Sequence, residues 1–314
     1  MIARRAACVV AAGILLAASA EAASRTSAFA PVDPGVRASA MGGAFTAVGG
    51  EPSAMYWNPA ALFYQEGRSV EASYEDLYGL SLAKRTFLTF GTKTVIEEPH
   101  YVGDRIEIRP DRSSGAAWAL GVESLFMDVA DQGYSEVSVG GAGAWGYGDR
   151  FAMGLSLRAL FVNSDLDGVS ALGYDLGLGV GWRYSSRARF GLAVPHLFSR
   201  LFWDFESTER LPLGVSLGWS RQFASTIVVA LEAEWREGEG SGPYRLAGGG
   251  EWWVVPSRLA ARAGYRRVAG GLDTIAEPTF GAAVRLAALR VDYAFLMGPD
   301  LLGDTHRVGL LVGF

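Results

Sequence analysis

The sequence predicts an all-β fold, a transmembrane antiparallel β-barrel of roughly 14 strands. Half of the residues are hydrophobic, yet no run approaches the roughly 18 consecutive apolar positions of a membrane-spanning helix. Large apolar residues instead alternate with small or polar ones over segments of about 10 to 13 residues, a length that suits a tilted membrane strand. The 41 glycines disfavour helices, and the 9 Trp, 12 Tyr and 16 Phe favour strands and membrane interfaces.

Residues 1–22 have the pattern of a secretory signal peptide. Arg4 and Arg5 precede an apolar run from residue 6 to residue 18, and small residues follow at alternate positions. This run is shorter than the roughly 20 residues of a spanning helix, so we expect cleavage rather than anchoring. The only cysteine, Cys8, lies in this segment and lacks a lipobox, so we expect a mature chain without a disulfide or a lipid anchor.

Residues 67–314 are predicted to form the barrel wall, because the period of two recurs throughout them. Between residues 171 and 184, one face carries Leu172 and Trp182 whereas the other carries Gly173 and Asp175. A soluble β-sandwich or propeller would also alternate, but the strand length and the wide apolar face favour the barrel. The predicted strands begin near Arg68, Arg85, Gly115, Tyr134, Arg150, Ala171, Arg187, Pro212, Thr226, Pro243, Ser257, Pro278, Leu289 and Asp304.

The lengths of the connections between predicted strands also indicate a membrane barrel. Tight ones, as at 185–186 and 223–225, alternate with longer ones, as at 124–133 and 267–277, which is the parity of periplasmic turns and external loops. One segment, 92–114, is too long for a turn. Either the early strand count is wrong, or a hairpin of residues 92–97 with 105–109 projects from the barrel.

The last predicted strand carries His306, Val308, Leu310 and Val312 on one face and ends in Phe314. A terminal amphipathic strand that ends in Phe resembles the signal by which the barrel-assembly machinery recognises its clients. We therefore predict Phe314 to be an assembly signal.

Residues 34–62 are rich in small residues and lack alternation. Glycine admits positive φ and Asn-Pro begins turns, so Gly42, Gly43 and Asn58-Pro59-Ala60 predict a compact element with tight turns. Several distinctive segments follow in order along the chain: 37–48, Tyr56-Trp57-Asn58-Pro59-Ala60, Asp175-Leu176-Gly177, Leu211-Pro212-Leu213-Gly214, Arg262-Ala263-Gly264-Tyr265, Asp292-Tyr293-Ala294-Phe295 and Gly303-Asp304-Thr305-His306-Arg307. In these segments the chain resembles the FadL-like outer-membrane barrels, most closely their PorV/PorQ-like branch.

The resemblance implies that residues 23–66 form a plug or hatch inside a 14-strand barrel, with the Asn-Pro-Ala turn in the lumen. The plug motif is then Gly42, Gly43, Asn58, Pro59 and Ala60. The chain departs from the branch at Pro195-His196-Leu197, where an Asn is usual.

No pattern predicts enzymatic chemistry, a metal or a cofactor. Gly42-Gly43 lacks the Lys-Ser or Lys-Thr of a phosphate loop, and His100, His196 and His306 are scattered without the spacing of metal ligands. A barrel hydrolase would need a Ser brought to one of these histidines, which nothing in the pattern indicates. The net charge of -5 offers no basic face for nucleic acid.

Charged residues on the small-residue face are candidates for lining the lumen. They either pair across strands and hold the plug, which we favour, or contact a ligand. These residues are Arg158, Asp175, Arg183, Glu232, Glu234, Arg262 and Asp292. An apolar loop of Leu197, Phe198, Leu201, Phe202 and Trp203 is a candidate for capturing a hydrophobic ligand, packing on lipid or binding a partner.

Two functions follow from the resemblance. The first is passive transport of hydrophobic small molecules through a plugged barrel in the cell outer membrane, reached by signal-peptide-directed export. The second is a PorV/PorQ-like accessory of protein secretion or surface attachment, of the type IX kind, that receives secreted protein cargo. In both cases outer-membrane lipid and the barrel-assembly machinery are expected partners, and an open general porin is not expected.

Overall fold

The computed structural model describes residues 28–29, 34–79, 81–102, 105–129, 132–148, 150–165, 169–204, 206–238, 244–270, 273–298 and 303–314. The predicted signal peptide lies outside them. The wall strands are β1 (Arg68–Asp76), β2 (Ala83–Val102), β3 (Arg105–Val129), β4 (Gln132–Tyr147), β5 (Phe151–Ser164), β6 (Ala171–Ser185), β7 (Ala188–Trp203), β9 (Gly214–Ala224), β10 (Ile227–Arg236), β11 (Tyr244–Val255), β12 (Leu259–Gly270), β13 (Asp273–Leu286), β14 (Leu289–Leu296) and β15 (Thr305–Gly313). A two-residue strand β8 (Thr208–Glu209) and the short helices α2 (Val36–Ala40), α3 (Ala54–Trp57), η2 (Pro59–Tyr64) and η3 (Leu77–Gly79) complete the described elements.

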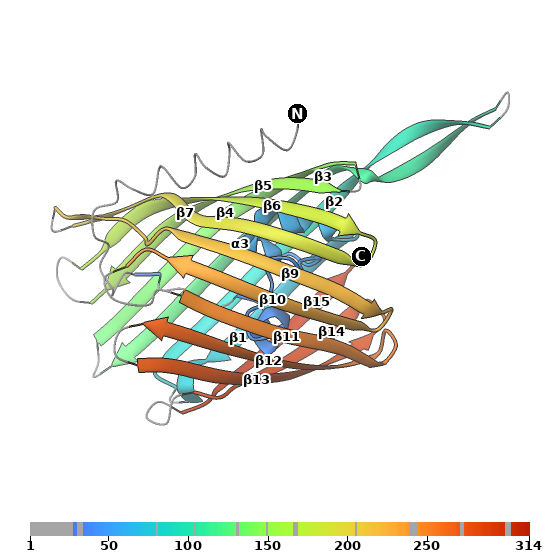
Figure 1. Cartoon of the computed structure of the whole chain (residues 1–314). Helices are drawn as coiled ribbons and strands as arrows, with labels where there is room; N and C mark the ends of the chain where they lie inside the picture. Colours follow the sequence, from blue (N-terminus) through green and yellow to red (C-terminus); the bar gives the residue numbers. More distant parts are fainter. Residues whose placement is uncertain are drawn as a thin grey trace.

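The wall strands close into one antiparallel barrel (Figure 1). Each strand pairs with its neighbour in sequence, β7 pairs with β9, and β1 pairs with β15 through Ser69 and Gly313. The short β8 pairs only with the end of β7. The prediction of about 14 wall strands is confirmed. Their starts lie within two residues of the predicted ones except at β3, which begins ten residues before Gly115, and at β13, which begins five residues before Pro278.

The two faces of the wall differ as the period of two predicts. Outward residues are large and apolar, and Met153 on β5 is 64% exposed. Inward residues are small or charged, and Asp175 on β6 is only 3% exposed. An apolar belt around a barrel with a polar interior is stable only in lipid, so the barrel is a transmembrane one and a soluble sandwich is excluded. No helix among the described residues is long and apolar enough to cross a membrane.

The barrel has a tight-turn end and a loop end. Residues 186–187, 225–226 and 287–288 make the tight turns. At the loop end, the long connections predicted at 124–133 and 267–277 are wrong, because the flanking strands continue and leave residues 130–131 and 271–272 between them. Asp128 and Gly133 have the composition of a loop, yet they pair across β3 and β4.

Residues 92–102 and 105–114 form the projecting hairpin. Pairing of β2 with β1 ends at Thr92, and pairing of β3 with β4 begins at Gly115. Beyond these points β2 and β3 pair with each other as far as Val102 and Arg105, as a ribbon that leaves the tight-turn end (Figure 1).

Residues 34–66, called the inner segment below, lie inside the barrel (Figure 1). The helix α2 packs against β12, β13, β14 and β15 on one side, and η2 packs against β3, β4, β5 and β6 on the other. The segment therefore spans the lumen from wall to wall.

Candidate functional site

The turns of the inner segment are made where the sequence predicts them. Gly42 and Gly43 have φ of 68° and 80°, a region that glycine adopts without steric cost. Asn58 is extended and begins η2, because its Oδ1 accepts a hydrogen bond from the Ala60 amide at 3.1 Å, with Pro59 at the first helical position. All five predicted motif residues lie in the barrel interior, and their role as a hatch stays a prediction.

Asn58 joins two turns of the inner segment to the wall. Its Nδ2 donates to the carbonyl of Thr46 at 2.8 Å and to the carbonyl of Val180 on β6 at 3.1 Å. The side chain is buried, so these bonds are not exchanged with water.

We expect Asn58→Ala to weaken the seating of the inner segment by about 1–3 kcal/mol, because buried polar groups of Thr46, Val180 and Ala60 lose a partner. Hydrogen exchange of amides 44–60 in the folded barrel measures this loss. Asn163→Ala, at an exposed wall position, is the control. Equal protection of these amides from exchange in the two variants would contradict the role of Asn58 in holding the inner segment.

Wall glycines bring the wall into direct contact with the inner segment. A Cβ atom at Gly154, Gly191 or Gly249 would overlap main-chain atoms of Ala60, Thr46 and Met41, respectively. These glycines belong to β5, β7 and β11, so the close approach occurs on several sides of the lumen.

A charged cluster fixes one side of the inner segment to β11, β12 and β14. We call it the charged anchor; it consists of Arg37, Glu51, Glu251, Arg262, Arg290 and Asp292. Arg37 contacts Glu251 with an Nη2–Oε1 distance of 2.7 Å, and Arg290 contacts Glu51 with an Nη2–Oε2 distance of 2.8 Å. Arg262 lies between Glu251 at 2.7 Å and Asp292 at 2.6 Å. Since the cluster is buried or nearly so, removing one charge would deprive each of its partners of one of two counter-ions, at a cost of about 3–5 kcal/mol.

Further polar contacts lie on the same side. Glu232 on β10 accepts from the amides of Phe45 at 2.9 Å and Thr46 at 2.8 Å. Glu71 on β1 accepts from the Ser53 amide at 3.1 Å. Strands β1, β10, β11 and β14 thus hold the inner segment through charged side chains.

The seven predicted lumen charges all lie on the inner wall. Arg158 pairs with Asp175 at 2.5 Å, and Glu232 and Glu234 both pair with Arg245 of β11, at 2.9 and 2.6 Å. Arg262 and Asp292 belong to the charged anchor, and Arg183 lies over the Tyr64 ring, 5.4 Å from its centre. The geometry is one of pairing, and contact with a ligand stays a prediction.

The sequence interpretation missed Arg37, Glu51, Glu251, Arg245 and Arg290. The last three are on strands and share the inward parity of predicted charges, so the period of two was enough to find them. Arg37 and Glu51 lie in a segment without periodicity, and no local signal marks them.

The predicted apolar capture loop is wrong as a loop. Leu197, Phe198, Leu201, Phe202 and Trp203 belong to β7, which continues past a bulge at Pro195–Leu197 where the pairing with β6 shifts and His196 has φ of 57°. The pair Pro195-His196 is the composition of a strand end, yet here it is a bulge inside a strand. Phe198 and Phe202 point outward with exposures of 63% and 50%, whereas Leu201 is buried in the lumen.

A cavity of about 90 Å³ lies between the inner segment and the loop end. Its lining includes Tyr56 and Trp57 of the inner segment, Glu136 of β4 and Arg158 of β5. His196 of the bulge also lines it, with Nδ1 3.0 Å from the Asp175 carboxylate. The described residues contain no group of three or more His, Cys, Asp or Glu side chains placed to hold a metal ion.

These features define a class: a transmembrane antiparallel β-barrel whose lumen is filled by the chain's own N-terminal segment. No protein-family model matches the sequence, and no curated protein matches it. Solved structures do match. The toluene transporter TbuX of Ralstonia pickettii superposes with a TM-score of 0.59 at 15% identity, over 89% of this chain and 98% of that one.

Two further solved barrels are similar. The toluene transporter TodX of Pseudomonas putida has a TM-score of 0.58 at 12% identity, over 91% of this chain and 98% of that one. A FadL homologue of Pseudomonas aeruginosa has a TM-score of 0.55 at 14% identity, over 86% and 96%. At these identities the similarity shows a shared fold, so the chain has a FadL-like barrel fold.

Proposed function

We propose that the chain is an outer-membrane channel for the passive entry of hydrophobic small molecules, with residues 23–66 as its plug. One observation carries the proposal: a FadL-like barrel is filled by its own N-terminal segment, beneath a cavity at the loop end. Two barrels of this fold are toluene transporters, which supports apolar solutes as the substrate class.

The proposed channel works by selective closure. Water-soluble solutes meet a lumen filled by packed side chains and paired charges, whereas an apolar solute is transferred favourably from water into apolar surroundings. The concentration gradient supplies the driving force. Outward residues such as Met153 contact lipid, and Phe314, 68% exposed at the tight-turn end, is available to the assembly machinery.

Membership of the PorV/PorQ-like branch stays a prediction of the sequence. No contact among the described residues favours the secretion accessory, so we propose transport alone.

We expect a Gram-negative host that produces the barrel to take up radiolabelled toluene several-fold faster than the same host with an empty vector. The control is a hydrophilic solute of similar size, whose uptake is expected to stay unchanged because the lumen is filled. Equal toluene uptake in the presence of folded, surface-exposed barrel would refute the proposal.

A further inference from the structure

We infer that an apolar ligand crosses the barrel between the inner segment and strands β3, β4 and β5, on the side opposite the charged anchor. The inference rests on the proposed function and names the route that the ligand takes. The contact surface along this route is called the apolar seam. Its residues are Ala54, Met55, Ala60, Ala61, Leu62 and Phe63 of the inner segment and Ala117, Ala119, Ala142, Ala144 and Ala152 of the wall.

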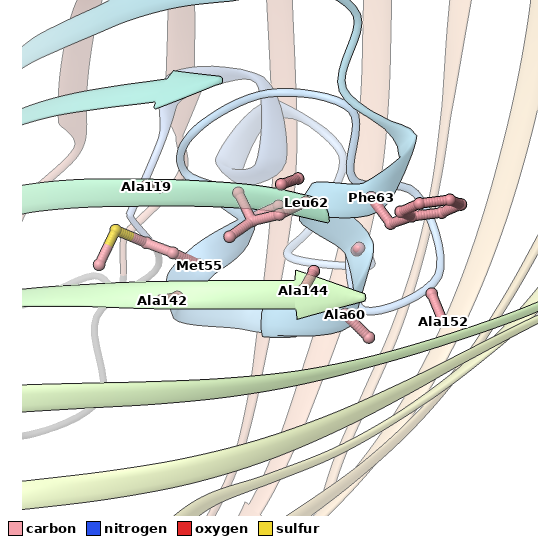
Figure 2. Close-up of a cluster of buried hydrophobic side chains, with 11 residues drawn as sticks. Met55, Ala60, Leu62, Phe63, Ala119, Ala142, Ala144 and Ala152 are labelled. Carbon is pink, nitrogen blue, oxygen red and sulfur yellow. The ribbon is translucent and has the colours of Figure 1, made fainter. Parts of the chain in front are cut away.

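The apolar seam is a dry contact between small and flexible side chains. Figure 2 shows Met55, Leu62 and Phe63 lying against the alanines of β3 and β4. Every member is buried. The hydrophobic wall residues here are all alanines and the wall also has glycines such as Gly121 and Gly146, so the inner segment meets a wall of small residues.

The seam is continuous from the cavity to the tight-turn end. Tyr56 lines the cavity and lies beside Ser138 of β4, at the end of the seam nearer the loop end of the barrel. At the tight-turn end of the seam, Phe63 fills the space that a side chain at Gly146 would need. The Lys93 ammonium lies 3.8 Å from the centre of the Phe63 ring.

The two sides of the inner segment are held by different forces. In the part of the chain that the structure describes, no hydrogen bond or ion pair joins residues 54–55 or 60–63 to β3, β4 or β5. On the opposite side, Arg37 and Glu51 are bound to Glu251 and Arg290. The inner segment is thus attached through ion pairs on one side. On the other side, residues 54–55 and 60–63 meet the wall through apolar contact, and the Arg158 guanidinium of β5 lies 5.6 Å from the centre of the Tyr56 ring.

This asymmetry decides the route. A hydrophobic ligand that enters the seam replaces one apolar contact by another, so little free energy of transfer is lost. The same ligand on the anchored side would separate buried charges that it is unable to compensate. Displacement of the inner segment therefore occurs from the seam, with the charged anchor as the fixed side.

A matched pair of variants tests the route. Leu62→Ala removes a fully buried side chain from the seam, and Met41→Ala removes one of similar size from the anchored side. We expect Leu62→Ala to raise toluene uptake about tenfold, because the cavity left behind weakens the closed contact, and Met41→Ala to leave it within about twofold. Similar uptake in the two variants would overturn the inference.

Photolabelling of the wild-type barrel gives an independent test should either variant fail to fold. A small phenyl diazirine is expected to modify Met55 and Leu62, with protection by excess toluene, and to spare Met41 and Phe45. Labelling of Met41 and Phe45 instead would overturn the inference that the ligand passes along the apolar seam. If toluene uptake by wild type equals that of the empty vector, the proposed function fails; if uptake is raised but labels lie on the anchored side, the seam alone fails.

Discussion

Arg290→Met is expected to release the inner segment from the wall. Arg290 is the cation between Glu51, at 2.8 Å, and Asp292, at 2.6 Å. Without it, two buried carboxylates lose a shared partner, and the cost of about 3–5 kcal/mol corresponds to a shift of about 10²- to 10⁴-fold in the equilibrium between the seated and the released inner segment. Planar-bilayer recordings should then show ion conductance that the wild type lacks, and trypsin should cleave the inner segment.

The double variant Arg290→Met with Glu51→Gln separates charge from packing. Neutralising Glu51, which keeps only Arg37 as a counter-ion, removes the excess negative charge and is expected to restore part of the closed state, so the double variant should conduct less than Arg290→Met alone. Arg258→Met, at an exposed position of a tight turn, serves as the control. A double variant that conducts as much as the single one would show that the charged anchor is not what seats the segment.

Gly249→Val is expected to have the second large effect. Its Cβ would overlap the main chain of Met41, which has no freedom to rotate away, so the inner segment has to shift from β11. Neighbouring Gly250 faces outward, where a Cβ would meet only the Val228 carbonyl at an ordinary 3.5 Å.

Gly250→Val is therefore the matched control, because valine suits a strand at both positions. We expect Gly249→Val to cost about 1–3 kcal/mol of seating free energy and to open a conducting lumen, and Gly250→Val to behave as wild type. Conductance can be measured in the same bilayers. If neither variant conducts ions, the close approach at Gly249 is not what holds the inner segment in its position.

The wall was predictable because its signal is local. Alternation fixes which residues of a strand face inward, so the faces of β6 and the inward charges Asp175 and Arg262 follow from the sequence. Strand ends were less predictable. Pro195-His196 and Asp128 have loop-like composition, but pairing with neighbouring strands overrides it.

The pairing of the charged anchor with the inner segment was not predictable, because it depends on contacts far apart in the chain. Arg37 meets Glu251 across 214 positions, and Arg290 meets Glu51 across 239. The inner segment has no periodicity from which the directions of its side chains follow. Its contacts are fixed only when the barrel closes around it. The sequence near one residue of such a pair therefore does not indicate which residue will be its partner.

The pairing of Ser69 with Gly313 has a consequence for biogenesis. The first and last wall strands are neighbours, so the barrel is sealed only after the whole chain has been made, and contacts of such sequence separation form slowly. The inner segment immediately precedes β1 and touches strands all around the lumen. It has to be enclosed while the wall is still open, so insertion into the bilayer and burial of the N-terminal segment are parts of one assembly event.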